Sequence, residues 1–218
     1  MTGTVKITMI DYGGSNLRSV QKAFEAVGVE VVVTNDTAEV RRAGRLVLPG
    51  VGAFQAGMNG LRARGLDEAI IEAVSTGVPL LGICLGMQLL FDMSEEMGAH
   101  PGLGLLPGRV LRFAGSAKGP GKPALKVPHM GWNQIEHAEA QPLLAGVPSG
   151  SFAYFVHSYY CAPADSEDVD YVIATADYGG RFAAIAGRDH IMGIQFHPEK
   201  SQSVGLRILE NFARLGAW

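Results

Sequence analysis

Three residues have the types and the local setting that nucleophilic catalysis requires: Cys84, His197 and Glu199. A thiolate that attacks an acyl carbon needs a base that later protonates the leaving group, and a carboxylate commonly fixes the tautomer of that histidine. Pro198 favours an extended residue before it, and residues i and i+2 of an extended segment point the same way. We therefore expect His197 and Glu199 to face one side, as a base and its orienting carboxylate.

Cys84 lies where a buried strand is expected to turn sharply into a helix. The apolar run 78–83 predicts the strand, and helical spacing continues from there to about Ser94. Gly82 and Gly86 supply the small residues that such a corner needs. A thiol on this corner lies at a helix N-terminus, where unpaired N–H groups and the helix dipole favour the thiolate. The alternative is that Cys84 is only a small buried hydrophobic residue.

The other five histidines carry weaker signals. His129 and His157 lie in strands rich in aromatic residues, where a packed histidine is usual. His100, His137 and His190 stand beside turn residues and are expected at the surface. His129 and His137 have no third ligand at metal spacing, so the sequence predicts no metal site.

The turn Pro49-Gly50-Val51-Gly52 follows an expected strand, and its two glycines let backbone N–H groups point at a negative charge. A dinucleotide-binding loop is disfavoured, because Gln55 stands where the third glycine of GxGxxG would be. We favour an oxyanion hole, since the turn leaves the same edge of the sheet as Cys84.

The elements that must position these residues change in character along the chain. The first half alternates strands and helices, which predicts a largely parallel sheet with helices on both faces. The second half has shorter strands with Gly and Pro turns, and a last amphipathic helix. The fold class we expect is therefore an α/β three-layer sandwich with a smaller antiparallel sheet from the C-terminal half, in a single domain over residues 1–218. The expected strands are 6–11, 29–33 (buried), 46–48, 78–83, 102–113, 126–136, 152–160, 171–176, 182–187 and 191–196, and the expected helices are 15–27, one or two within 53–75, 85–94 and 203–215.

Composition excludes several classes of protein. The 218 residues are 47% hydrophobic and 18% charged, which is ordinary for a globular protein. A net charge of −3 argues against an electrostatic nucleic-acid surface, and the lysines near the Gly/Pro-rich patch 115–121 read as a solvated loop. No apolar run reaches the roughly 18 residues of a membrane span. Because a catalytic thiol must stay reduced, we expect Cys84 and Cys161 to be free and the protein to be cytoplasmic.

Several motifs together resemble those of the class I, or triad, glutamine amidotransferases. They are GICLGMQ around Cys84, PGVG at 49–52 and FHPE at 196–199, with the histidine 113 residues after the cysteine. Within that class, IDYGGSNLRSV, KVPHMGWN, YFVHSYY and FHPEKSQ resemble the glutaminase subunits of imidazole glycerol phosphate synthase in histidine biosynthesis. The stretch GSAKGPGKPAL is longer and richer in Gly and Pro than this resemblance implies.

The resemblance implies a mechanism without a metal or cofactor. Cys84 attacks the side-chain amide of L-glutamine, His197 passes a proton to the leaving ammonia, and Glu199 orients His197. Two backbone N–H groups, those of Val51 and Leu85, hold the oxyanion. By the same resemblance, the amino-acid end of the substrate is held by Gly52, Gln88, Ser158 and Tyr159.

The resemblance also implies a partner: a (βα)8-barrel cyclase that forms a heterodimer with this chain and uses the ammonia to make imidazole glycerol phosphate and AICAR from PRFAR. We expect its docking to switch on the glutaminase by favouring a peptide flip in the 49–52 turn. The positions implied at the interface are Asn16, Met130, Trp132, Tyr154 and Lys200, although a core tryptophan is the ordinary alternative.

Three other functions remain open at this point. A glutaminase subunit for a different acceptor synthase would share the triad but not KVPHMGWN or YFVHSYY. A non-catalytic regulatory relative would be expected to lack one member of the triad, and none is missing. A free hydrolase or peptidase that uses the same triad is the third alternative.

Overall fold

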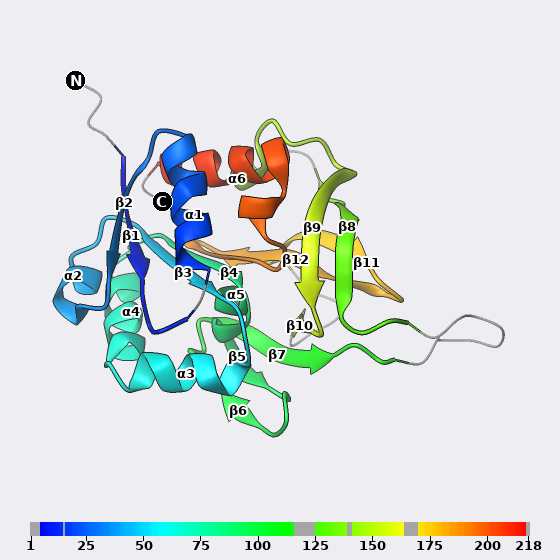
Figure 1. Ribbon diagram of the computed structural model, residues 1–218, viewed down its shortest axis with the longest axis horizontal. Helices are drawn as coiled ribbons and strands as arrows, with labels where there is room; N and C mark the ends of the chain where they lie inside the picture. Colours follow the sequence, from blue (N-terminus) through cyan, green and yellow to red (C-terminus); the bar gives the residue numbers. More distant parts are fainter. Residues whose placement is uncertain (1–4, 15, 116–124, 139–140, 164–169, 217–218) are drawn as a thin grey trace.

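The computed structural model describes residues 5–14, 16–115, 125–138, 141–163 and 170–216, and across these residues a seven-stranded sheet forms the centre of the fold (Figure 1). The strands from β13 to β2 run parallel to their neighbours, whereas β12 and β11 extend the sheet in antiparallel pairing. The predicted, largely parallel sheet is thus confirmed. In spatial order its strands are β11 (Val172–Asp177), β12 (Arg181–Arg188), β13 (Ile191–Ile194), β4 (Leu80–Cys84), β3 (Leu46–Gly50), β1 (Lys6–Ile10) and β2 (Glu30–Thr34).

Helices cover both faces of this sheet, as predicted. Side chains alternate along the strands, so Ile7 and Met9 of β1 face one layer and Ile10 faces the other. The first layer contains α1 (Leu17–Ala26) and α6 (Gln202–Arg214). The second contains α2 (Thr37–Arg41), α3 (Phe54–Arg62), α4 (Leu66–Ser75) and α5 (Leu85–Leu89). Among the described helices, none has the length and apolar character needed to cross a membrane.

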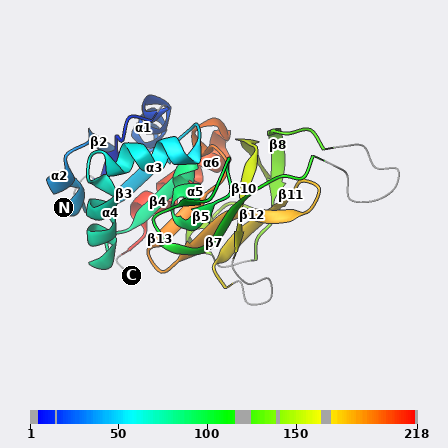
Figure 2. The ribbon, with the colours of Figure 1, turned by 90° about the horizontal axis from the view of Figure 1, so that it is seen from below.

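The described residues also form two smaller sheets. One is four-stranded, in the order β10 (Tyr159–Pro163), β7 (Leu106–Arg112), β5 (Phe91–Ser94) and β6 (His100–Pro101). The other, a two-stranded antiparallel ribbon of β8 (His129–Ile135) and β9 (Ser151–His157), lies toward the end of the molecule away from α2 and α4 (Figures 1 and 2). The short 3₁₀ helices η1 (Pro142–Leu144) and η2 (Pro198–Lys200) complete the fold.

Three expectations about individual elements were wrong. The helix after Cys84 ends at Leu89, because the carbonyl groups of Leu89 and Leu90 accept N–H groups from residues 103, 105 and 106, and Phe91 onward pairs as β5. The strand expected to be buried at 29–33 is the edge strand β2, and Val33 is exposed. The strand expected at 152–160 breaks at Ser158, where the chain passes from β9 to β10. The Gly/Pro-rich patch lies outside the described residues from 116 onward.

Candidate active site

The register of the parallel strands brings the expected catalytic segments together. Gly50 at the end of β3 pairs with Cys84 at the end of β4, and Ile194 at the end of β13 pairs with Ile83. The segments that follow these three strands therefore leave neighbouring positions at one edge of the sheet, where open α/β proteins place their ligands. This is how the fold joins the 49–52 turn, Cys84 and His197.

Cys84 occupies the sharp corner that the sequence predicts. Its backbone angles, φ 55° and ψ −109°, are unusual for a residue with a side chain and mark a strained turn between β4 and α5. A methyl group on Gly82 would stand 2.6 Å from the carbonyl oxygen of Gly86, and one on Gly86 would stand 1.7 Å from that of Leu48. Both positions therefore require glycine, because the start of α5 presses directly on the backbone of the sheet.

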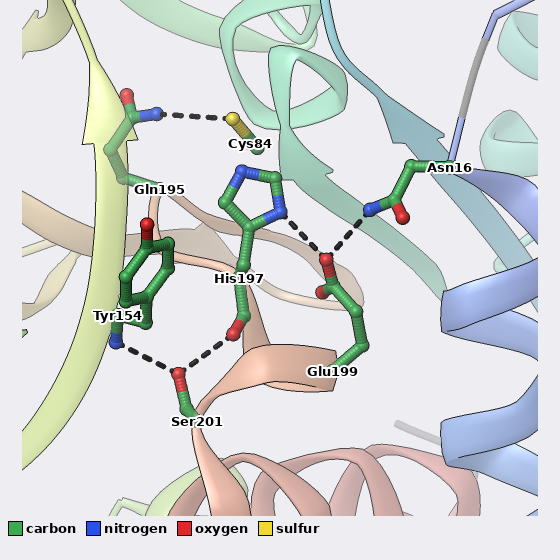
Figure 3. Close-up of polar contacts among 7 residues, drawn as sticks. All are labelled: Asn16, Cys84, Tyr154, Gln195, His197, Glu199 and Ser201. Atoms are coloured by element: carbon green, nitrogen blue, oxygen red, sulfur yellow. Dashed lines mark hydrogen bonds and ion pairs between the residues drawn. The ribbon is translucent and has the colours of Figure 1, made fainter. Parts of the chain in front are cut away.

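His197 lies between Cys84 and Glu199, as Figure 3 shows. Its Nδ1 is 2.7 Å from Oε1 of Glu199, and the amide of Asn16 donates to the same oxygen over 2.7 Å. With Nδ1 bound to the carboxylate, Nε2 is the nitrogen that remains for the thiol. His197 is 1% exposed, so this chain of contacts is shielded from water.

His197 and Glu199 both have shifted pKa values. Burial alone would lower the pKa of His197, but hydrogen bonding and charge from Cys84 and Glu199 outweigh it and raise that pKa to about 9. Burial alone would raise the pKa of Glu199, whereas its contacts with His197 and Asn16 hold that pKa below its ordinary value. The favoured state at neutral pH is an imidazolium beside a carboxylate.

The route by which His197 and Glu199 meet differs from the expected one. His197 itself is extended, with φ −96° and ψ 96°, but Pro198 begins the 3₁₀ turn η2, so the two side chains meet across a turn and not along a strand. The backbone of His197 is held on two sides. Its N–H donates to the carbonyl of Tyr154 over 2.9 Å, and its carbonyl accepts the Ser201 hydroxyl over 2.7 Å. The same hydroxyl accepts the N–H of Tyr154 over 2.9 Å.

A cavity of about 370 Å³ opens beside Cys84 and His197. All six residues expected to hold the oxyanion or the substrate line it: Val51, Gly52, Leu85, Gln88, Ser158 and Tyr159. The structure therefore brings them together in one place. Their individual roles stay predictions.

Sequence reasoning missed two polar residues, one that lines this cavity and one that lies against Cys84. Glu96 lines it and accepts the N–H of Phe54, at the start of α3, over 2.7 Å. Gln195 is fully buried two residues before His197, and its amide nitrogen is 4.0 Å from the Cys84 sulfur. Gln195 Oε1 in turn accepts the amide of Gln88 over 3.2 Å. A glutamine in the otherwise apolar run IMGIQF was the available signal for Gln195, and an acidic pair just after β5 was the signal for Glu96.

His129 and His157 form a buried pair beside the cavity, in agreement with the expectation that they are packed. His129 Nδ1 is 3.0 Å from His157 Nε2, and His157 Nδ1 is 2.8 Å from the carbonyl of Tyr159. Burial lowers the pKa of His129 to about 4 and that of His157 to about 3, so both are neutral. The three histidines expected at the surface are half-buried, and His190 Nε2 bonds the carbonyl of Val74 over 2.8 Å.

The expected interface residues fall into two groups. Met130 and Trp132 are 62% and 47% exposed on β8, and Trp132 pairs across the ribbon with Tyr154. The Lys200 ammonium lies 5.8 Å from the centre of the Tyr154 ring. Asn16 instead reaches Glu199, so the structure links it to the triad. Exposed Phe152 on β9 extends the apolar surface of the ribbon and was not anticipated.

Cys84 and Cys161 are both free thiols, and complete burial raises the pKa of Cys161 well above its usual value. That shift suits an inert structural thiol. Within the described part of the chain, His, Cys, Asp and Glu side chains do not gather in threes as metal ligands would.

The chain resembles known proteins along nearly its whole length. The family described as "Glutamine amidotransferase class-I" matches residues 8–215. "Imidazole glycerol phosphate synthase subunit HisH" of Syntrophotalea carbinolica is 57% identical over 94% of this chain and 98% of that protein. The subunits of the same name from Salinibacter ruber and Geobacillus thermodenitrificans are 50% and 52% identical, over 95% and 94% of this chain and 94% of each of those proteins.

Solved structures show the same fold at lower sequence identity. "Crystal structure of glutamine amidotransferase" superposes with a TM-score of 0.71 at 18% identity, over 95% of this chain and 99% of that one. "Structure of PurLQS from Thermotoga maritima" gives 0.70 at 20% identity, over 96% and 97%. Since the family match covers most of the chain and these three HisH relatives are 50% to 57% identical over at least 94% of it, the chain belongs to the class-I glutamine amidotransferases and, among them, to the HisH subunits.

Proposed function

We propose that this chain is the glutaminase subunit of imidazole glycerol phosphate synthase in histidine biosynthesis, and that it hydrolyses L-glutamine at Cys84. The observation that carries the proposal is the contact of His197 with Glu199 beside Cys84, at a cavity of about 370 Å³. Class-I glutamine amidotransferases are glutamine-hydrolysing enzymes, and no member of the expected triad is missing here.

In the first half of the reaction, Cys84 attacks the side-chain amide carbon of glutamine as a thiolate beside protonated His197. The carbonyl becomes an oxyanion that accepts hydrogen bonds from the N–H groups of Val51 and Leu85. His197 then gives its Nε2 proton to the amide nitrogen, the carbon–nitrogen bond breaks, and ammonia leaves a thioester on Cys84. Glu199 holds the ring in position and stabilises its charged form throughout.

In the second half, neutral His197 takes a proton from water as the water oxygen attacks the thioester carbon. A second oxyanion forms in the same place and collapses, which releases glutamate and regenerates the Cys84 thiolate beside protonated His197. The atoms balance: glutamine and water give glutamate and ammonia.

The cavity supplies groups for the other end of the substrate. Glutamine carries an α-ammonium and an α-carboxylate, so it needs an acceptor and donors at fixed positions. We assign the carboxylate of Glu96 to the ammonium side, because it is an acceptor at the cavity. Gly52, Gln88, Ser158 and Tyr159 complete the substrate contacts.

The acceptor of ammonia is a second subunit. The relatives are named as subunits of imidazole glycerol phosphate synthase, which implies a partner, and we assign it as a (βα)8-barrel cyclase that forms a heterodimer with this chain. The exposed Met130, Trp132 and Phe152 on the β8–β9 ribbon support a docking surface there, since aromatic residues and methionine are enriched in interfaces. The need for reduced thiols favours the cytoplasm.

Ammonia release from glutamine, measured with and without the cyclase, tests the proposal. Cys84→Ala in the complex should abolish glutamine-dependent synthesis of imidazole glycerol phosphate, while added ammonium salt restores it, because only the nucleophile is lost. Cys161→Ser is the matched control and should retain the glutaminase. Failure of ammonia to rescue would give Cys84 a structural role, and a cyclase that neither binds the chain nor raises its activity would point to a different acceptor synthase.

A further inference from the structure

A buried tyrosine hydroxyl next to the 49–52 turn takes no part in the chemistry described above. Tyr12 follows β1 and is 4% exposed, and its Oη has no hydrogen-bond partner among the residues that the structure describes. Burial raises the pKa of this phenol, so the hydroxyl keeps its proton. An unpaired buried hydroxyl is unfavourable, and phenylalanine would fill the same space without that cost. The arrangement calls for a second state in which the hydroxyl is paired.

The Tyr12 hydroxyl lies against Gly50, and the peptide that follows Gly50 carries the N–H that we assign to the oxyanion. A methyl group on Gly50 would stand 2.0 Å from Oη, and a carbon–carbon bond adds about 1.5 Å. Oη therefore lies within about 3.5 Å of the Gly50 Cα. The next peptide joins Gly50 to Val51, the residue whose N–H we assign to the oxyanion.

The surroundings hold the phenol in this place. A methyl group on Gly14 would stand 2.9 Å from the phenol ring, and one on Gly60 would stand 2.5 Å from the Tyr12 carbonyl oxygen. Tyr12 packs in the hydrophobic layer with Leu48 and is not among the residues that line the cavity, whereas Val51 lines it. The phenol thus lies on the side of the turn away from the substrate.

The N–H and C=O groups of one peptide point in opposite directions. When the N–H of Val51 turns toward the cavity, the carbonyl of Gly50 turns away from it, toward the layer that contains Tyr12. We propose that the Tyr12 hydroxyl then donates to the Gly50 carbonyl and holds this peptide in the orientation that completes the oxyanion hole. Tyr12 is a positioning residue that touches no substrate, and this role rests on the proposed glutaminase function.

The test compares the complex of this chain and the cyclase with a complex that carries Tyr12→Phe. A single hydrogen bond that forms only in the active orientation should lower kcat for glutamine about three- to tenfold and leave KM within about twofold. The γ-aldehyde analogue of glutamine, which forms a tetrahedral adduct on Cys84, should bind more weakly by the same factor. The unfolding temperature of the isolated variant should stay equal or rise, because no hydrogen bond of the described structure is lost.

Tyr171→Phe is the matched control. Tyr171 is buried in the same hydrophobic layer, and its hydroxyl donates to the carbonyl of Pro107. This variant should lower the unfolding temperature and leave kcat unchanged, the reverse of the result expected for Tyr12→Phe.

Two results would overturn the positioning role. One is that Tyr12→Phe leaves kcat and the aldehyde affinity unchanged. The other is that Tyr12→Phe slows the alkylation of Cys84 by iodoacetamide by the same factor as it lowers kcat. The second would show that the hydroxyl acts on the thiol. Wild-type turnover in the same assay separates this inference from the function itself. An inactive wild type refutes both, whereas an active wild type with an equally active Tyr12→Phe refutes the positioning role alone.

Discussion

His197 combines two opposing influences in one side chain. Burial disfavours its charged form, yet Cys84 and Glu199 raise its pKa to about 9. In the proposed mechanism, the proton that leaves with ammonia is therefore present on the ring at neutral pH before substrate binds. Asn16 contributes indirectly, because its hydrogen bond helps to keep Glu199 ionised.

The raised pKa of His197 predicts how the activity depends on pH. Because His197 must be protonated to release ammonia, kcat/KM for glutamine should fall as the pH rises through about 9. The same raised pKa stabilises the fold fully below the unfolded value of about 6.5, and that stabilisation is lost as the pH rises through about 9.

Glu199→Gln is the variant that checks this prediction. It removes a charge that raises the pKa of His197, so the alkaline limb of kcat/KM should move to lower pH. The variant should also retain more activity than His197→Ala, because the base remains. An alkaline limb at the same pH in wild type and variant would mean that another group sets it.

At the scale of single residues, the sequence was sufficient to place Cys84, His197 and Glu199 in one site, because glycines around Cys84 and a proline beside His197 mark them. It was insufficient for Asn16, Gln195 and Tyr12, whose roles depend on contacts between distant segments. Asn16 is 183 positions from Glu199 along the chain, and no local pattern reports such a contact.

The elements around the site are held by a few shared polar groups. Ser201 is the clearest example, because its hydroxyl donates to the His197 carbonyl and accepts the N–H of Tyr154, which joins η2 to β9. Ser201→Ala should lower the free energy of unfolding by about 1–3 kcal/mol, since it leaves a part-buried N–H and a carbonyl without this partner. It should also lower kcat by loosening His197.

Urea unfolding and steady-state kinetics check the Ser201 prediction. Ser203→Ala, on the exposed first turn of α6, is the matched control and should change neither quantity. Equal stability of the two variants would show that the hydroxyl does not join the elements.

The packed histidines predict an acid-sensitive element. Because burial lowers the pKa values of His129 and His157 below 6.5, the unfolded chain takes up protons first, and stability is lost as the pH falls from about 6.5 toward about 4. For one such histidine the free energy of unfolding should fall by about 2 kcal/mol between pH 7 and pH 5. His129→Gln, which supplies an amide for hydrogen bonding but cannot titrate, should show a smaller fall; an equal fall would place the acid sensitivity elsewhere.

Element boundaries were predictable where local pattern decides and not where tertiary pairing does. The apolar run at β4 and the amphipathic pattern at α6 required no other information. Phe91–Ser94 continues a helical pattern but becomes β5, because its backbone groups pair with the 102–106 segment and with β7. The exposed position of β2 depends on strand order, which the pattern of the strand itself does not report.

The two ends of the molecule contribute different features to the site. The layered helices and the parallel sheet fix the corner at Cys84, while the β8–β9 ribbon carries the exposed Met130 and Trp132 and reaches His197 through Tyr154. Docking on the ribbon would therefore press on an element that is bonded to the proposed base. This two-ended arrangement was not predictable, because the ribbon was expected only as part of a smaller sheet.

We expect the isolated chain to hydrolyse glutamine slowly and the cyclase to accelerate it, most strongly when the cyclase holds its own substrate. Gly52 has φ +113° and open space around it, so the turn has the freedom to reorient. An oxyanion donor that is withheld until docking accounts for about 100- to 1,000-fold in rate. Glutaminase turnover of the chain alone, with the cyclase, and with the cyclase plus its ligand checks this; three similar rates would contradict it.

The strained backbone of Cys84 also bears on how this chain could change over generations. At φ 55° and ψ −109° a glycine would rest more easily than a cysteine, so a mutation that removes the nucleophile in this way would strengthen the fold. Selection for stability alone would thus act against the catalytic thiol. A lineage would therefore keep Cys84 only while the activity is useful. In a regulatory descendant without that activity, a glycine could replace the cysteine at this corner.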